Sequence, residues 1–134
     1  MSTSRGRKSQ KGQSLVELLI VLPVLLIIVA GLLDLGRLYH AYVAVTDASG
    51  EGASYGAMHP DDQNAIRARA AQATAGLVQI SSDQVTVEYP TDSVQVTVTY
   101  SFTLMTPLVR SIVPGGMIPL RAVTSETILS GDVD

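Results

Sequence analysis

Two residues at the junction KGQSLVELLIVLP have the type and the placement to carry chemistry. Gly12 has no Cβ, so the active site of another protein can approach its backbone closely. Glu17 places a carboxylate within an apolar run, where a charge costs roughly 2.5–3.5 kcal/mol at the centre of a membrane helix and less near its end. That carboxylate needs a partner or must reach the lipid headgroups, and the residue types alone leave both interpretations open.

The remaining polar residues show no spacing that is typical of a catalytic or metal-binding site. The two histidines, His40 and His59, have no carboxylate cluster at metal-ligand spacing, and the chain has no cysteine. We expect neither a phosphate-binding loop of the GxGxxG, GxxxxGKS or GxxxxGKT type nor a GxSxG nucleophile elbow, and no serine has a recognisable set of partners. We therefore expect no enzyme activity, no cofactor and no metal ion, which disfavours a hydrolase.

The segment that must position Glu17 is long and apolar enough to cross a bilayer. Leu18 to Leu33 contains no charge, and the stretch from Gln13 to Leu33 would span about 31 Å as a helix, against a hydrocarbon core of roughly 30 Å. All 12 acidic residues follow Gly12, whereas four basic residues precede Gln13: Arg5, Arg7, Lys8 and Lys11. This bias predicts a single pass through the lipid bilayer, with the N-terminus in the cytoplasm and the C-terminus outside.

The basic N-terminal stretch could in principle bind nucleic acid. It contains no aromatic residue that could stack on bases, and the rest of the chain is acidic, so we expect no nucleic-acid partner. A cleavable secretory signal is a second alternative, with Val29-Ala30-Gly31 as its cleavage site. The helical pattern continues through that site, which favours an uninterrupted helix.

The helix is expected to extend well past the membrane and to bend within it. Pro23 cannot donate to the carbonyl of Leu19, which predicts a kink. Asp34 and Arg37 are three residues apart, so they share a helix face and are expected to form an ion pair. Past Leu33, apolar and aromatic residues recur at helical spacing: Leu35, Leu38, Tyr39 and Tyr42. We expect a leader at 1–12, a helix at 13–58 and a small extracytoplasmic domain at 59–134.

The C-terminal half changes from helical to alternating periodicity. A second helix is predicted from Asp61 to about Ala75, and its buried side is marked by Ile66, Ala70, Ala73 and Leu77. Alternating residues predict strands at 84–89 and 94–104, and a third strand is expected at 120–129. The predicted fold class is α+β, with a long N-terminal transmembrane helix, a second helix and an antiparallel sheet of about three strands.

The junction and the stretches that follow it resemble known families. KGQSLVELLIVLP resembles a type IV prepilin signal, in which a membrane aspartyl peptidase cuts after the glycine and glutamate is the fifth mature residue. The resemblance implies a cut between Gly12 and Gln13, with Glu17 as that fifth residue. GQSLVELLIVLPVLL, GLLDLGRLYHAYVAV and ASGEGASYGAMHP are similar to successive blocks of TadE-like proteins, the minor pilins or pseudopilins of tight-adherence (Tad, or Flp) pilus systems. The family often has arginine where Gly50 and Ser54 stand.

This resemblance implies a function in assembling a pilus for adhesion or secretion. Its implied partners are a prepilin peptidase, and other pilins and Tad pilus assembly proteins that contact the N-terminal helix. Glu17 is implied to meet the freed N-terminal amine of a neighbouring subunit. The implied location is the bacterial cytoplasmic membrane and, after assembly, the extracellular pilus. Two alternatives remain open: an uncleaved signal-anchored protein with an extracytoplasmic binding domain, and a domain released by signal peptidase near Leu32.

Overall fold

The structure, a computed structural model, describes residues 8–129 of the chain. Arg5 and Arg7 of the predicted leader lie outside the described residues. The elements follow one another in the order α1 (Lys8–Met58), α2 (Gln63–Gln72), a 3₁₀ turn (Ser82–Gln84), β1 (Val85–Glu88), β2 (Ser93–Thr103), α3 (Pro107–Ile112), a second 3₁₀ turn (Pro114–Gly116) and β3 (Met117–Thr127). The predicted α+β fold class is therefore confirmed.

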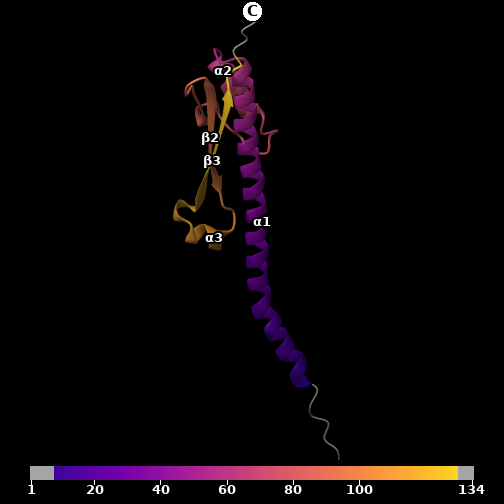
Figure 1. The fold of residues 1–134 in the computed structure, drawn as a ribbon. Helices are drawn as coiled ribbons and strands as arrows, with labels where there is room; N and C mark the ends of the chain where they lie inside the picture. Colours follow the sequence, from indigo (N-terminus) through magenta and orange to yellow (C-terminus); the bar gives the residue numbers. More distant parts are fainter. Residues whose placement is uncertain (1–7, 130–134) are drawn as a thin grey trace, which may run out of the picture.

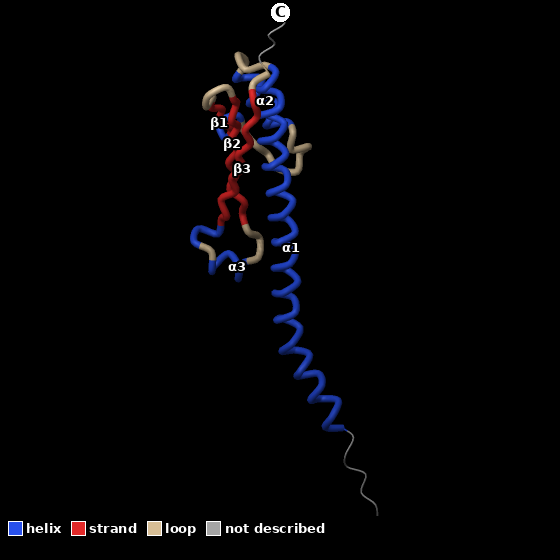
Figure 2. Tube along the Cα trace, in the orientation of Figure 1, coloured by secondary structure: helices blue, strands red, loops and turns tan. Residues whose placement is uncertain are grey.

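Helix α1 dominates the shape of the molecule. It is one continuous helix of 51 residues, and Figure 1 shows that it bends in its indigo, N-terminal part. Its N-terminal half extends away from the rest of the chain, whereas its C-terminal half lies alongside the sheet (Figure 2). The apolar side chains from Leu15 to Val29 are exposed, while Ala44, Val45 and Ala48 are buried. The two halves of one helix therefore face different surroundings.

The three strands form an antiparallel sheet in the order β1-β2-β3. Val85 pairs with Val98 at one side of β2, and Val98 pairs with Ala122 at the other. The alternation predicted for β2 is present, with Val94, Val96 and Val98 fully buried. The third strand begins earlier than expected, at Met117 rather than residue 120, because β3 is an edge strand of this sheet and an edge strand tolerates Pro119.

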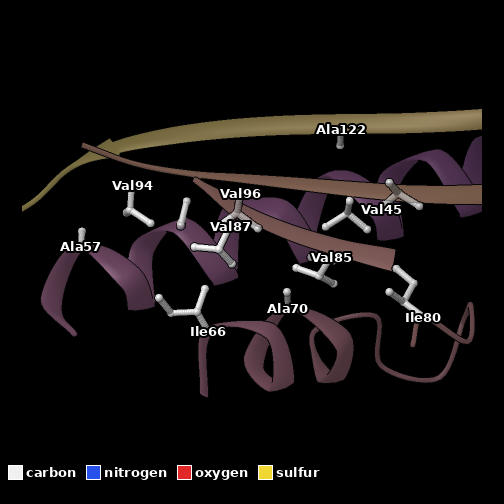
Figure 3. Packing of buried hydrophobic residues seen from close by; sticks show 13 residues of the cluster. Val45, Ala57, Ile66, Ala70, Ile80, Val85, Val87, Val94, Val96 and Ala122 are labelled. Atoms are coloured by element: carbon white, nitrogen blue, oxygen red, sulfur yellow. The ribbon is translucent and has the colours of Figure 1, made fainter. Parts of the chain in front are cut away.

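The core lies between the sheet, the C-terminal half of α1 and α2 (Figure 3). Glycines in α1 allow this packing to be close. A Cβ at Gly56 would lie 2.9 Å from Cγ2 of Val94, and one at Gly52 would lie 3.0 Å from Cβ of Ala70. The small residues of this part of α1 thus place its backbone against β2 and α2.

The second helix starts as expected and ends early. Oδ1 of Asp62 accepts a hydrogen bond from the backbone N–H of Ala65 at 2.9 Å and so caps α2. The helix ends at Gln72, not near residue 75, and Ala75 and Gly76 then take positive φ angles of 50° and 78°. The prediction that Leu77 is buried was wrong, because these two residues turn the chain before Leu77 can continue the helix face. Val78 is buried in its place.

Candidate processing and assembly segment

The predicted cleavage junction lies on the exposed N-terminal part of α1. Gly12 and Gln13 have helical backbone, a few residues after α1 begins at Lys8. Both are exposed, and a Cβ built at Gly12 would meet no atom within 4 Å. Nothing in the described part of the chain therefore covers this peptide bond, but it is held in a helix.

Glu17 lies one helical turn after Gln13. Residues four apart share a helix face and are separated by about 6 Å along the axis. The Glu17 side chain is exposed, and none of the ion pairs between described side chains includes it. Pro23 is also exposed and is the proline inside α1. The structure thus places all four predicted residues, Gly12, Gln13, Glu17 and Pro23, on one uncovered stretch of helix, where no other element of the described chain meets them.

The same stretch has the character of a membrane span. The helix from Gly12 to Met58 contains a window with a mean hydropathy of 3.0, and none of that window is buried. The core helix of a water-soluble protein would have such a window mostly buried. An apolar surface of this length needs lipid or other subunits to cover it.

Asp34 marks the end of the uncovered stretch. The residue is only 4% exposed, and its carboxylate accepts hydrogen bonds from the backbone N–H groups of Thr106 at 2.8 Å and Met105 at 3.2 Å. Nη1 of Arg37 donates to Oδ1 of Asp34 at 3.2 Å, which confirms the predicted pair. The Arg37 guanidinium lies 5.4 Å from the centre of the Phe102 ring. These contacts fasten the end of β2 to α1 where the apolar run stops.

The role of Asp34 in holding the end of β2 is not visible in the sequence. The three-residue spacing to Arg37 predicts the local ion pair, but Thr106 is 72 positions away and no local pattern reveals that contact. The expectation that the chain lacks GxSxG was wrong, because the stretch GASYG at 52–56 has this spacing, which is that of a nucleophile elbow. That motif requires a strand-to-helix turn, whereas these residues lie inside α1 and its two glycines pack on β2 and α2. We therefore assign GASYG to packing.

Among the described residues, no group of three His, Asp or Glu side chains could hold a metal ion.

The model of the TadE-like protein family matches residues 12–54. The N-terminal segment of this chain is TadE-like. No curated protein and no solved structure matches the chain.

The TadE-like segment begins at Gly12 and includes both the uncovered and the packed parts of α1 up to Ser54. TadE-like proteins are structural proteins associated with Tad pili, and they are not an enzyme family. The match therefore supports a Tad pilus-associated protein that interacts with other pilus proteins. Together with the uncovered apolar helix, it supports a membrane-anchored chain.

Proposed function

We propose that this chain is a TadE-like minor pilin or pseudopilin that a prepilin peptidase cleaves between Gly12 and Gln13. The processed subunit takes part in assembly of a Tad pilus used in adhesion or secretion. The observation that carries the proposal is the TadE-like match, which begins at the glycine of the prepilin-like signal and continues along α1. Residues 1–12 are then the leader, residues 13–58 are the transmembrane helix and its extracytoplasmic extension, and residues 59–134 are the small extracytoplasmic domain.

The proposed cut requires the helix to open locally. Gly12 lies near the start of α1, and helix ends fray at little cost in free energy. Glycine also weakens a helix interior by about 1 kcal/mol relative to alanine. Both effects favour access to the peptide bond between Gly12 and Gln13, which nothing in the described chain covers.

The proposed assembly contact joins Glu17 to the new N-terminal amine of a neighbouring subunit. Its support is the lack of a described ion pair for Glu17 together with its place in an apolar run, because a carboxylate surrounded by apolar helices needs a cationic partner. We attribute the bend in the N-terminal part of α1 to Pro23, which removes one helix hydrogen bond. Neighbouring helices can satisfy the carbonyl that Pro23 leaves free.

The second candidate is an uncleaved, signal-anchored protein with an extracytoplasmic binding domain. The observation that favours it is the helical backbone at Gly12 and Gln13, since a bond within a helix is a poor substrate until the helix opens. N-terminal sequencing of the protein from membranes separates the candidates. A start at Gln13 supports the pilin, a start at Met1 or Ser2 supports the uncleaved protein, and a start near Leu32 identifies a released domain.

A matched pair of variants tests whether the chain is cleaved after Gly12. Gly12→Val places a β-branched side chain next to the proposed cut and should leave a species longer by the twelve leader residues. Gly31→Val adds the same side chain to another glycine of α1 that has no atom within 4 Å of its Cβ, and it should be processed normally. Mature protein of normal size from Gly12→Val would contradict the proposal that a prepilin peptidase cuts after Gly12.

A further inference from the structure

The tip of the β2–β3 hairpin exposes large apolar side chains. We define the hairpin tip as residues 105–117, which include α3. Met105 is 71% exposed, Leu108 51%, Ile112 77% and Met117 50%. Water-soluble surfaces seldom gather side chains of this size in one short segment, so such a cluster marks a contact with another apolar body.

The hairpin tip is held in a defined shape. The backbone N–H of Leu104 donates to the carbonyl of Gly116 at 3.1 Å and closes the base of the tip. Val109 and Val113 pack against the cluster that contains Phe102 and Leu104. The exposure of Leu108 and Ile112 therefore follows from the fold of the tip, since their neighbours Val109 and Val113 are the side chains that turn inward.

The charge of the hairpin tip is also unusual for this acidic chain. Residues 105–117 contain no Asp or Glu, and their only charged residue is Arg110. The stem of Arg110 lies over Gly116, because a Cβ at that glycine would come within 2.5 Å of Cγ of Arg110. An exposed guanidinium among apolar side chains is suited to a phosphate, which it can bind with two parallel hydrogen bonds.

The fold places this tip at the level where the apolar run of α1 ends. Strand β2 runs antiparallel to α1, because Val94 lies beside Gly56, Val96 lies beside Gly52, and Thr106 binds Asp34. The chain therefore approaches the uncovered half of α1 as it enters α3, and Figures 1 and 2 show α3 at that end of the hairpin. Leu32 and Leu33, immediately before Asp34, are exposed at 62% and 67%.

We propose that the hairpin tip inserts into the outer surface of the bilayer that α1 spans. Leu108 and Ile112 enter the acyl-chain region, and Arg110 binds the phosphate of an anionic phospholipid. The lipid is favoured over a second copy of the chain because the tip lies at the level where the exposed apolar run of α1 ends. In addition, the hydrogen bonds from the backbone N–H groups of Met105 and Thr106 to Asp34 hold the tip at this level within a single copy. The chain thus has a second membrane contact besides its helix.

The test uses the full chain, one copy per nanodisc, in lipid that contains phosphatidylglycerol. Since the chain has no cysteine, a single introduced cysteine takes an environment-sensitive dye at one place only. Ile112→Cys labels the hairpin tip. Met58→Cys labels an exposed apolar residue at the C-terminal end of α1, away from the apolar run of the helix. Bromine atoms on the acyl chains quench only a dye that reaches them.

The proposal expects a blue-shifted emission and several-fold stronger bromine quenching for the Ile112 label than for the Met58 label. Leu108→Cys should behave like Ile112→Cys. Arg110→Glu should reduce quenching at Ile112 in zwitterionic lipid, whose headgroup carries the same phosphate, and should reduce it further in anionic lipid, which also repels the new carboxylate. Equal, water-like emission from the Ile112 and Met58 labels would overturn the proposal. Shielding of Ile112 that appears only in discs with two copies would also overturn it, in favour of a subunit contact.

Discussion

Replacing Gly56 with alanine tests how closely α1 approaches the sheet. The new methyl group would lie 2.9 Å from Cγ2 of Val94 and 3.1 Å from Cδ1 of Ile66. Both neighbours are fully buried, and the β-branched side chain of Val94 has little rotamer freedom. The methyl group can be admitted only if α1 moves away from β2, and overpacking of this kind costs about 1–3 kcal/mol.

A second effect of the same substitution acts in the opposite direction. Alanine in place of glycine stabilises a helix interior by about 1 kcal/mol, and by less near the helix end where Gly56 lies. Gly50 supplies the control, because a Cβ there meets no atom within 4 Å. Gly50→Ala should stabilise the fold, and Gly56→Ala should be less stable than it by about 1–3 kcal/mol. Gly52→Ala, with contacts of 3.0 and 3.1 Å, should lie between them.

The measurement is thermal unfolding of the full chain in detergent, followed by near-ultraviolet circular dichroism. Tyr55 and Tyr100 pack against the core and report its loss, and the chain has no tryptophan to dominate the signal. For a folded unit of this size, each kcal/mol shifts the midpoint by about 4–8 °C. A midpoint for Gly56→Ala at or above that of Gly50→Ala would show that the helix and the sheet are not packed this closely.

Three further predictions concern assembly, membrane orientation and stability. Glu17→Leu should leave cleavage and insertion intact but abolish piliation, and Glu17→Gln should fail almost as badly; wild-type pilus numbers with normal processing would exclude a role in assembly. A reporter enzyme that is active only outside the cytoplasm should work when fused after Asp134, and cytoplasmic activity of that fusion would reverse the proposed orientation. Asp34→Ala should lower the unfolding temperature, because two backbone N–H groups lose their acceptor, whereas Asp47→Ala, at an exposed position of α1, should leave it unchanged.

The parts of the fold that follow from local periodicity could be predicted from the sequence. The apolar run predicts α1, and the strict alternation through Val94, Val96 and Val98 predicts β2 and its buried face. Both signals extend over many residues, so single exceptions do not hide them. The fold class and the antiparallel arrangement follow from these elements and from the turn between the first two strands.

The hairpin tip could not be predicted in this way. Helix α3 has six residues and starts at Pro107, so its sequence offers no full period of the helical pattern. The contact between Asp34 and Thr106 joins residues far apart in sequence, and only the packed fold brings them together. The proposed roles of Gly12 and Glu17 stay predictions for a different reason, because their partners are other molecules.

The distance between Glu17 and Asp34 bears on both interpretations of Glu17, which are contact with the lipid headgroups and pairing with the amine of a neighbouring subunit. Seventeen helical residues separate them, or about 26 Å along α1, which is close to the roughly 30 Å thickness of a hydrocarbon core. If the hairpin tip holds Asp34 at the outer surface, Glu17 lies near the inner headgroups while the subunit is in the membrane. Extraction into a filament removes those headgroups, and the carboxylate then needs the amine of a neighbour. In the proposed pilin, contact with headgroups and pairing with a subunit are successive states of Glu17, and on that proposal Glu17→Leu should spare membrane insertion and prevent assembly.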